Sequence, residues 1–424
     1  MVACSTDVCQ LSRFNSSFQV YSFMTKRRAA IVCPVRTPVG TYGGSLRNVP
    51  AEKLMAAAIH AVLDRTSLPA ERIDEVIIAQ SYGNAEAPCM GRYAALEANL
   101  PVAVGGYQVD RRCGSGLQAI VNAAMMVETG YADVVLAGGV ENMSNIEHYT
   151  TDIRWGARMG SVKLHDRINR GRERSQPEWR FGVISGMIET AETLAREYDI
   201  SRVEADAFAA RSHRRANEAW DAGKFDAEIV PITSKDRKGA EQTMIRDEGI
   251  RPETTIESLA KLRTLMRDGT VTAGNACQQN DAAAACLVVA EDKLHELNLS
   301  PMGMFVGWAA AGCDPARMGI GPVPAVEKLF KKTGFTFDKL DLVEVNEAFA
   351  CQVLAVLKSW GLDANDERIN ANGSGISLGH PIGATGGRIL ASMLHELERR
   401  QGRYALETMC IGSGQGMAAI FERP

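Results

Sequence analysis

Short apolar segments alternate with longer amphipathic segments along most of the chain, and this alternation restricts the fold more than any other feature. Residues 29–33 and 75–79 have the length and composition of buried strands, and residues 51–64 between them follow a helical pattern. Further strand-like runs lie at residues 133–137, 286–290, 304–311, 341–345 and 417–421, and helix-like runs lie at 323–332, 349–360 and 383–399. Strands that alternate with helices predict α/β layers rather than a β-sandwich.

The alternation stops in the middle of the chain. Residues 154–180 contain eight Lys or Arg against three Asp or Glu, and charged helical patterns follow at 189–198 and 202–222. Strand signals return only at Val271. We therefore predict an insertion into the first α/β region. The basic run has two interpretations, a solvated loop and a site for an anionic ligand such as a phosphate.

Charge and cysteine usage exclude several classes of protein. The formal net charge of −4 gives no indication of a nucleic-acid partner, and no apolar stretch approaches the roughly 18 to 20 residues of a membrane span. The ten cysteines form no Cys-x-x-Cys pair and no cluster with metal-ligand spacing, which favours reduced thiols in a cytoplasmic protein without a metal site. Residues 1–25 are interpreted as an N-terminal extension, with a short organellar transit peptide as the alternative.

Cys113 lies in the run DRRCGSGLQ (residues 110–118), directly before a predicted helix. A helix start offers unpaired N–H groups and a favourable dipole, and both stabilise a thiolate. The run therefore indicates a nucleophilic cysteine that becomes acylated. A buried cysteine at a helix start is the alternative of equal weight.

His380 lies between Gly379 and Pro381 in the Gly-rich run at residues 372–388. His380 precedes a predicted helix and is not on a helix face. Its interpretation as a histidine of the apolar core is therefore the weaker one. A histidine on a loop can act as a base toward a thiol or donate its N–H to a carbonyl oxygen.

Two more runs place a polar or nucleophilic side chain beside a Gly-rich turn or at the start of a helix. CIGSGQG (residues 410–416) places Cys410 beside a Gly-rich turn, where backbone N–H groups can face a substrate. NEAFA (residues 346–350) opens an apolar helix, so Asn346 is either a helix cap or the holder of a water molecule. Each α/β region thus has a strand that leads through a polar turn into a helix, at Cys113 and at Asn346, and we predict that these two turns are equivalents about a pseudo-twofold axis.

Together these runs resemble the thiolase family. Cys-Gly-Ser-Gly-Leu-Gln, Asn-Glu-Ala-Phe-Ala, Gly-His-Pro-Ile-Gly-Ala and Cys-Ile-Gly occur in the family's order and approximate spacing, and VTAGNA at residues 271–276 adds a fifth match. The resemblance covers residues 28–422 and implies two duplicated α/β halves that form a five-layered αβαβα core. The implied boundaries are an N-terminal half at 26–145, an inserted loop domain at 146–272, the end of the N-terminal half at 273–298 and a C-terminal half at 299–424.

The resemblance also implies the roles of individual residues. Cys113 is similar to the nucleophile that takes up the acyl group, His380 to its base, and Cys410 to the second cysteine, which exchanges the α-proton of acetyl-CoA. Asn346 would hold a water that forms one oxyanion hole with His380, and the backbone N–H groups of Cys113 and Gly412 would form the other. The substrate-binding residues implied in the same way are Met187, Arg237, Ala273, Cys277 and Phe349.

The implied reaction is the condensation of two acetyl-CoA to acetoacetyl-CoA, or the CoA-dependent cleavage of a 3-ketoacyl-CoA. Both follow a ping-pong scheme in which CoA, acetyl-CoA and 3-ketoacyl-CoA are substrates and no metal or redox cofactor takes part. A homodimer or homotetramer is implied as well. The motifs leave open the acyl-chain length and the direction, synthesis or degradation of fatty acids by β-oxidation.

Several residues depart from the usual thiolase pattern. Asp110 stands where Asn is usual, Cys277 replaces a Ser that contacts the pantetheine arm, Ser413 interrupts a triple-Gly turn, and Gly186 precedes Met187 where a His is frequent. Three other functions fit the motifs less well: a decarboxylating ketoacyl synthase, a cysteine protease, and an acyl-CoA-binding protein without turnover. A second catalytic cysteine is absent from the synthase pattern, a protease would give the Gly-rich runs no role, and a binding protein would lack one of the three reactive side chains.

Overall fold

The computed structural model describes residues 27–184, 186–235 and 239–424, so the predicted N-terminal extension at 1–25 lies outside the described residues. Within these parts of the chain ten strands form one mixed sheet in the order β12-β13-β14-β11-β1-β10-β5-β3-β4, with β2 paired to β10. Their bounds are β1 (Ala29–Arg36), β2 (Gly40–Thr41), β3 (Glu75–Ala79), β4 (Gly105–Val109), β5 (Val134–Asn142), β10 (Asn280–Ala290), β11 (Gly303–Gly312), β12 (Leu342–Val345), β13 (Tyr404–Ile411) and β14 (Gln415–Glu422). Only Ala30 and Ile31 of β1 pair with β11, so the sheet consists of two half-sheets joined at a short seam.

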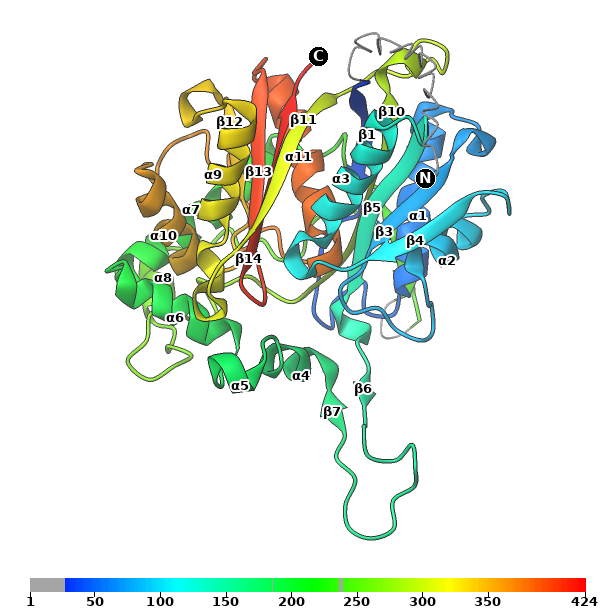
Figure 1. Cartoon of the computed structure of the whole chain (residues 1–424). Coiled ribbons are helices and arrows are strands. Elements are labelled where there is room, and N and C mark those ends of the chain that lie inside the picture. The colour runs from blue at the N-terminus through cyan, green and yellow to red at the C-terminus, as the bar shows by residue number, and fades with distance from the viewer. Residues whose placement is uncertain (1–26, 185, 236–238) are drawn as a thin grey trace, which may run out of the picture.

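Six helices cover the faces of these half-sheets. They are α1 (Ala51–Thr66), α2 (Met90–Glu97), α3 (Ser115–Glu128), α9 (Pro322–Thr333), α10 (Ala350–Trp360) and α11 (Thr385–Arg399). Side chains of β3 alternate between two cores, because Val76 and Ile78 pack with α1 and α2 while Ile77 and Ala79 pack with α3. In the other half, β12, β13 and β14 lie between the α9–α10 layer and α11 (Figure 1). The predicted five-layered αβαβα fold is confirmed.

The two halves share one plan. In the first, β1, α1 and β3 follow each other along the chain, and β11, α9 and β12 do so in the second. The antiparallel pairs β1–β10 and β11–β14 and the parallel pairs β3–β5 and β12–β13 also correspond. The counterpart of Asn346, which follows β12, is therefore Gln80, which follows β3, and the counterpart of α3 is α11. The predicted equivalence of the Cys113 and Asn346 turns is wrong, because it rested on a local pattern that recurs twice in each half.

The central helices α3 and α11 meet at their first turns. A Cβ atom on Gly116 would lie 2.9 Å from the backbone N of Gly386 and 2.9 Å from the backbone O of Gly383. Any larger residue at Gly116 would separate the helices, so glycine is required for this close approach. The turn that carries Cys113 and the loop that carries His380 precede these two helices, and they therefore reach the same region of the molecule.

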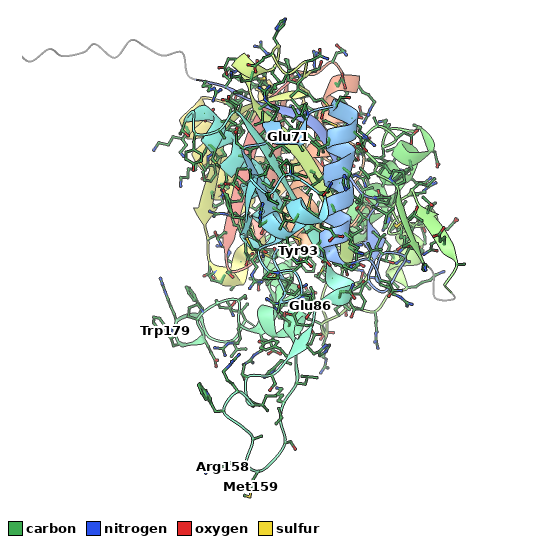
Figure 2. The ribbon with its side chains drawn as sticks, turned by 90° about the vertical axis from the view of Figure 1, so that its right-hand side faces the viewer. Glu71, Glu86, Tyr93, Arg158, Met159 and Trp179 are labelled. Atoms are coloured by element: carbon green, nitrogen blue, oxygen red, sulfur yellow. The ribbon has the colours of Figure 1, made fainter. Side chains whose placement is uncertain are left out.

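The segment predicted as an insertion runs between β5 and β10. It contains α4 (Arg167–Glu173), α5 (Glu178–Phe181), α6 (Met187–Glu197), α7 (Arg202–Asp221), α8 (Ile256–Ala260) and the two-stranded pairs β6 (His148–Tyr149) with β7 (His165–Asp166) and β8 (Ile232–Lys235) with β9 (Glu241–Met244). Residues 150–164, between β6 and β7, project from the body, with Arg158 and Met159 at the far end (Figures 1 and 2). No helix in the described ranges has the length and hydrophobicity that crossing a membrane requires.

A buried arginine links the insertion to the core through ion pairs. Arg36, at the end of β1, is fully buried; its Nε donates to Glu228 at 2.6 Å and its Nη1 to Asp247 at 2.8 Å. Both carboxylates belong to the insertion. A buried ion pair of this kind is expensive to break, because removing one partner leaves an uncompensated charge away from water.

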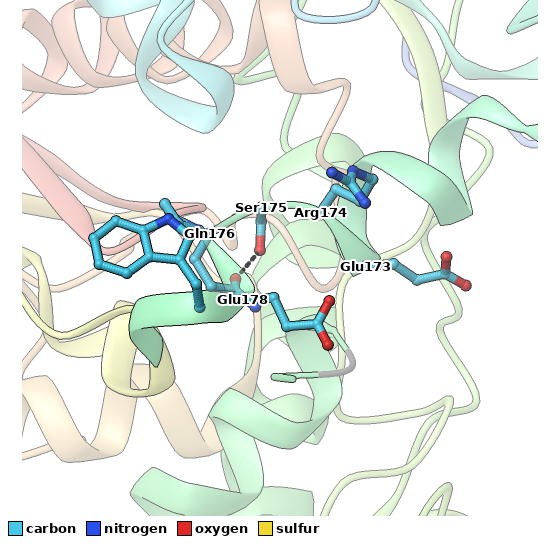
Figure 3. Close-up of a pocket in the computed structure, with 7 residues that line it drawn as sticks. Glu173, Arg174, Ser175, Gln176 and Glu178 are labelled. Atoms are coloured by element: carbon cyan, nitrogen blue, oxygen red, sulfur yellow. Dashed lines mark hydrogen bonds between the residues drawn. The ribbon is translucent and has the colours of Figure 1, made fainter. Parts of the chain in front are cut away.

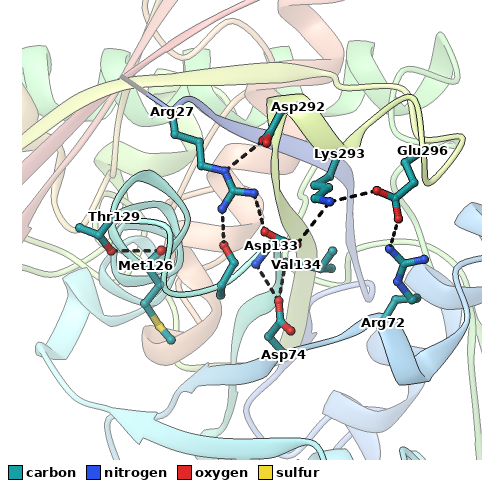
Figure 4. A network of polar contacts seen from close by, with 11 residues as sticks. Arg27, Arg72, Asp74, Met126, Thr129, Asp133, Val134, Asp292, Lys293 and Glu296 are labelled. Atoms are coloured by element: carbon teal, nitrogen blue, oxygen red, sulfur yellow. Dashed lines mark hydrogen bonds and ion pairs between the residues drawn. The ribbon is translucent and has the colours of Figure 1, made fainter. Parts of the chain in front are cut away.

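A second set of charges lies at the surface where β1 begins (Figure 4). The Arg27 guanidinium donates to Asp133 and, at 3.0 Å, to Asp292, while Glu296 accepts from Lys293 at 3.0 Å and from Arg72 at 2.6 Å. Exposed pairs of this type contribute about 0–1 kcal/mol each. They therefore tie the starts of β1 and β5 to the turn after β10 without deciding the stability of the fold.

Candidate active site

Cys113 lies in the 3₁₀ turn η2 (Arg112–Gly114), which leads directly into α3. Burial raises the pKa of the Cys113 thiol above its ordinary value, although the backbone N–H of Gly412 and the charge of Arg112 both lower it. The thiolate expected from the helix start alone is therefore not the resting form, because desolvation of the negative charge outweighs the nearby donors. A base must remove the proton before this thiol can attack a carbonyl group.

His380 lies on the loop before α11, in a position fixed by the backbone. Its own N–H donates to Asn280 Oδ1 at 2.9 Å, and the preceding Gly379 has a φ of +106°. Burial, with a further effect from the charge of Arg388, lowers the pKa of the imidazole to about 3. His380 is therefore neutral at physiological pH and able to accept a proton.

A threonine hydroxyl determines which ring nitrogen of His380 carries the proton. Thr385 Oγ1 lies 2.7 Å from His380 Nδ1 and donates its own hydrogen to the carbonyl of Pro381 at 2.9 Å. Because a hydroxyl has a single hydrogen, Thr385 must accept from Nδ1–H. The geometry thus assigns the Nδ1–H tautomer and leaves Nε2 free to act as the base.

Asn346 lies beside the His380 ring, directly after β12. It is fully buried, and its Nδ2 lies 3.4 Å from His380 Nδ1 and 3.5 Å from Nε2. Its Oδ1 has no hydrogen-bond partner among the described residues. The helix-cap interpretation is wrong, because α10 begins at Ala350 and its N-cap position is Phe349.

Cys410 approaches Cys113 from the other half of the molecule. It is fully buried near the end of β13, just before the turn in which Ser413 and Gly414 have φ values of 74° and 81°. Burial, followed by the thiols of Cys113 and Cys277, raises the pKa of Cys410 well above its ordinary value. Cys410 is therefore a neutral thiol at neutral pH, next to the other two.

Most of the implied substrate-binding residues surround the same thiols. Cys277 N–H donates to the Ala348 carbonyl at 2.9 Å, and Ala276 pairs with Phe349, so the 273–277 segment lies along the start of α10. Burial, followed by Cys113, raises the pKa of the Cys277 thiol to about 12. Met187, the first residue of α6, has its Sδ 3.9 Å from the position of a Cβ on Gly412.

The remaining predicted residues lie apart from this group or outside it. Ala273 is exposed on the surface of its segment, and Arg237 lies outside the described residues. Between Cys113 and His380 no hydrogen bond is found among the described contacts, although η2 is in contact with the turn η7 (Ile382–Ala384) that follows His380. The structure thus brings Cys113, Cys277, Cys410, Gly412 and Met187 together. His380 lies on the adjoining loop, beside Asn346 from the end of β12.

Sequence reasoning missed an acidic residue that joins the two halves near this site. Glu141, fully buried in β5, accepts the backbone N–H groups of Ser81 at 3.1 Å, Tyr82 at 3.2 Å and Gly383 at 2.9 Å. Burial raises its pKa to about 7, although these three donors lower it. A signal was present, because Glu141 follows the uncharged run VVLAGGV, where a carboxylate needs partners.

Two hollows border α4 of the insertion. One, of about 830 Å³, is lined by residues 173–179, where the Ser175 hydroxyl donates to Gln176 (Figure 3). The other, of about 270 Å³, is lined by the residue that precedes Cys113 and by residues of α4. No group of three or more His, Cys, Asp or Glu that could hold a metal ion occurs among the described side chains.

Two family models match almost the whole chain. The model "Thiolase, N-terminal domain" matches residues 29–292, and "Thiolase, C-terminal domain" matches residues 299–423. The beta-ketothiolase BktB of Cupriavidus necator is 44% identical over 400 residues, which are 94% of this chain and 99% of that protein. The mitochondrial 3-ketoacyl-CoA thiolase of Mus musculus is 41% identical, over 93% of this chain and 98% of the relative.

Solved structures show the same likeness. The acetyl-CoA acetyltransferase of Bacillus anthracis superposes with a TM-score of 0.90 at 41% identity, covering 94% of this chain and 99% of the other. Human mitochondrial 3-ketoacyl-CoA thiolase in complex with CoA superposes with a TM-score of 0.87 at 41% identity, covering 94% and 98%.

Proposed function

We propose, because the chain belongs to the thiolase family, that it transfers acyl groups between CoA thioesters through an acyl group carried on Cys113. Its substrates are acetyl-CoA, 3-ketoacyl-CoA and CoA. The reaction is either the condensation of two acetyl-CoA to acetoacetyl-CoA or the thiolytic cleavage of a 3-ketoacyl-CoA, and the relatives named above include enzymes of both descriptions.

One observation supports this proposal more than any other. Cys113 and Cys410 come from different halves of the chain, yet their thiols interact with each other, and the Gly412 N–H bonds to Cys113. A nucleophile, a second thiol acid and an oxyanion donor in one buried place are the groups that thiolysis of a C–C bond requires.

The first step needs a thiolate and a stabilised oxyanion. His380 Nε2 accepts the proton of Cys113, and the thiolate attacks the ketone carbon of the 3-ketoacyl-CoA. The backbone N–H groups of Cys113 and Gly412 then donate to the developing oxyanion. Because His380 is buried and neutral, it takes up this proton without first losing one to the solvent.

The second step breaks the C–C bond. The electron pair of that bond passes to the thioester as an enolate, whose oxygen is stabilised by His380 and by a water held on Asn346. Cys410 donates its proton to the α-carbon, which completes acetyl-CoA and leaves the shortened acyl group on Cys113. The CoA thiol, deprotonated by the Cys410 thiolate, then attacks this thioester, and the Cys113 thiolate leaves and regains its proton from His380 as the new acyl-CoA is released. All atoms balance without a redox or metal cofactor.

Around this chemistry we assign the substrate's pantetheine arm to Met187, Ala273, Cys277 and Phe349. Arg237 is assigned to the nucleotide end of CoA, together with part of the basic run at residues 154–180. A homodimer or homotetramer in the cytoplasm is the proposed assembly and location.

Mass spectrometry after brief exposure to acetyl-CoA tests the proposal. An acetyl adduct is expected on Cys113. Cys89 is an internal control, because it is an exposed thiol that non-specific acylation would reach more readily. An adduct on Cys89 with Cys113 unmodified would contradict the assignment of the nucleophile.

A further inference from the structure

The 270 Å³ cavity beside Cys113 has an unusual lining. Its walls come from the segments after β3 and β4 on one side and from β6 and α4 on the other. The lining residues are Ser81, Tyr82, Asp110, Arg112, Tyr149, Arg167, Arg170, Gly171 and Arg174. Four guanidinium groups and one carboxylate therefore surround a space that suits the end of a small chain.

The positive charge of this cavity is only partly compensated. Arg167 pairs with Glu147, and Arg170 Nη1 lies 3.4 Å from Glu173. The side chains of Arg112 and Arg174 have no ion-pair partner among the described residues. Asp110 already accepts the Arg112 backbone N–H at 2.7 Å. A cluster of guanidinium groups with free donors is the arrangement that binds a carboxylate or a phosphate.

The arginine next to the nucleophile is held in place by its backbone and by an aromatic ring. Arg112 has a φ of +48°, a left-handed conformation that side chains rarely adopt. Its carbonyl accepts from the hydroxyls of Ser81 at 3.0 Å and Ser115 at 2.6 Å, and its guanidinium lies 5.5 Å from the centre of the Tyr82 ring. Strained residues that are fixed by several partners are common at binding sites.

The cavity shares its electrostatic surroundings with the reactive thiol. Burial raises the pKa of Cys113, Arg112 lowers it and Asp110 raises it. Burial likewise raises the pKa of the Tyr82 phenol, and Cys113 adds to that effect. Arg112 lines the cavity and directly precedes Cys113 in η2, so an anion bound here would lie close to an acyl group on Cys113.

We propose that this cavity is an anion-binding subsite which receives the carboxylate at the far end of an acyl group carried on Cys113. The preferred substrate class would then be 3-ketoacyl-CoAs whose acyl chain ends in a carboxylate. This inference rests on the proposed function. The same guanidinium groups would also accept free phosphate, which shares the chemistry of a multidentate oxyanion.

The phosphates of CoA are not the anion at this position. The pantetheine arm separates the sulfur of CoA from its nearest phosphate by a long chain of bonds, whereas Arg112 is the residue adjoining Cys113. None of the residues assigned to the pantetheine arm lines the cavity. We therefore assign the arginines of α4 to the acyl group of the substrate. The part of the basic run that we assign to the nucleotide of CoA does not include them.

The test compares two substrates of equal length, a 3-ketoacyl-CoA that ends in a carboxylate and one that ends in an uncharged amide. We expect the wild-type protein to prefer the carboxylate in kcat/KM. The double substitution Arg170→Gln/Arg174→Gln should lower this preference by about tenfold or more, because it removes two charge-assisted donors. The double substitution Arg72→Gln/Arg214→Gln is the matched control, since it also removes two exposed guanidinium groups but neither of them lines the cavity, and it should keep the wild-type preference.

Calorimetric titration with inorganic phosphate separates the two sources of the anion. If the substrates are not distinguished but phosphate binds the wild type and the control, and binds Arg170→Gln/Arg174→Gln at least about tenfold more weakly, the subsite stands with free phosphate as its ligand. If neither preference nor phosphate binding depends on Arg170 and Arg174, the proposal is wrong. A double variant that only changes the oligomer mass would assign these arginines to a subunit interface and overturn it as well. Failure of the thiolase reaction itself would appear separately, as the absence of both turnover and acylated Cys113, while the phosphate titration would still be decisive.

Discussion

Replacing Thr385 by Val should slow the acylation of Cys113 without changing the shape of the site. Thr385 is fully buried, accepts from His380 Nδ1–H and donates to Pro381. Valine has nearly the same shape but neither bond. A net hydrogen bond contributes about 0.5–1.5 kcal/mol, and a buried group left without its partner costs about 1–3 kcal/mol.

These values translate into a redistribution of the two tautomers of His380. Loss of about 1.4 kcal/mol from the Nδ1–H form lowers the ratio of this form to the Nε2–H form roughly tenfold, and loss of twice that amount roughly a hundredfold. Only the form with a free Nε2 accepts the proton of Cys113. We therefore expect acylation to slow measurably in Thr385→Val, by at most about a hundredfold.

The measurement is a single-turnover experiment in which acetyl-CoA is mixed with excess enzyme and the acyl-Cys113 adduct is followed by quenched mass spectrometry. Thr385→Ser is the matched control, because it keeps the hydroxyl and should stay within about threefold of the wild type. The thermal midpoint of each variant verifies that it is folded. Equal acylation rates in the Val and Ser variants would refute the assigned tautomer.

The pH dependence gives an independent check on the same base. Since burial lowers the pKa of His380 to about 3, the imidazole remains unprotonated as the pH falls from 7 to 5. The titration of His380 should therefore cause no loss of the wild-type acylation rate near the ordinary histidine pKa of 6.5. A loss centred there and abolished by substitution of His380 would show that the histidine is exposed to water during the reaction.

Three further outcomes are expected. Cys410→Ser should keep acylation of Cys113 but lose the exchange of deuterium into the α-carbon of bound acetyl groups, because a hydroxyl is a much weaker acid; undiminished exchange, followed by mass spectrometry, would make Cys410 a packing residue. Arg237→Gln should raise the KM for CoA by a salt-sensitive factor of about two to five while kcat is unchanged, whereas an unchanged KM with a smaller oligomer would indicate an interface. Arg36→Met should lower the free energy of unfolding by about 3–5 kcal/mol in denaturant titrations, because two buried carboxylates lose their partner; a loss below about 1 kcal/mol would contradict the buried ion pair.

The layered architecture followed from the sequence because it depends on local periodicity. Buried strands such as 75–79 are short and apolar throughout, and the helices between them have one apolar face. The alternation of strand and helix layers can therefore be predicted from the sequence. The equivalence of the turns at Cys113 and Asn346 was predicted wrongly for the same reason. Each half contains two strand-to-helix turns, and only the pairing of β3 with β5 and of β12 with β13 shows which ones correspond.

The chemistry of the site was likewise predictable from the sequence only in part. The motifs around Cys113, His380 and Cys410 are contiguous in the chain, and they were sufficient to predict an acyl-transferring member of the thiolase family. The protonation states were not predictable in this way. A helix start alone suggested a thiolate at Cys113, but burial raises the pKa of that thiol, and this burial depends on β13, η7 and α11, which lie far along the chain.

The reactive groups could therefore be identified from the chain, because each motif is a short run whose residue types and spacing suffice to identify it. Which of these groups meet depends on how the chain folds. Glu141 and Gly383 are 242 residues apart yet share a hydrogen bond, and Arg112 and Arg170 line one cavity from different parts of the fold. Such contacts are set by the packing of distant layers, and the tautomer of His380 and the anion subsite beside Cys113 depend on that packing.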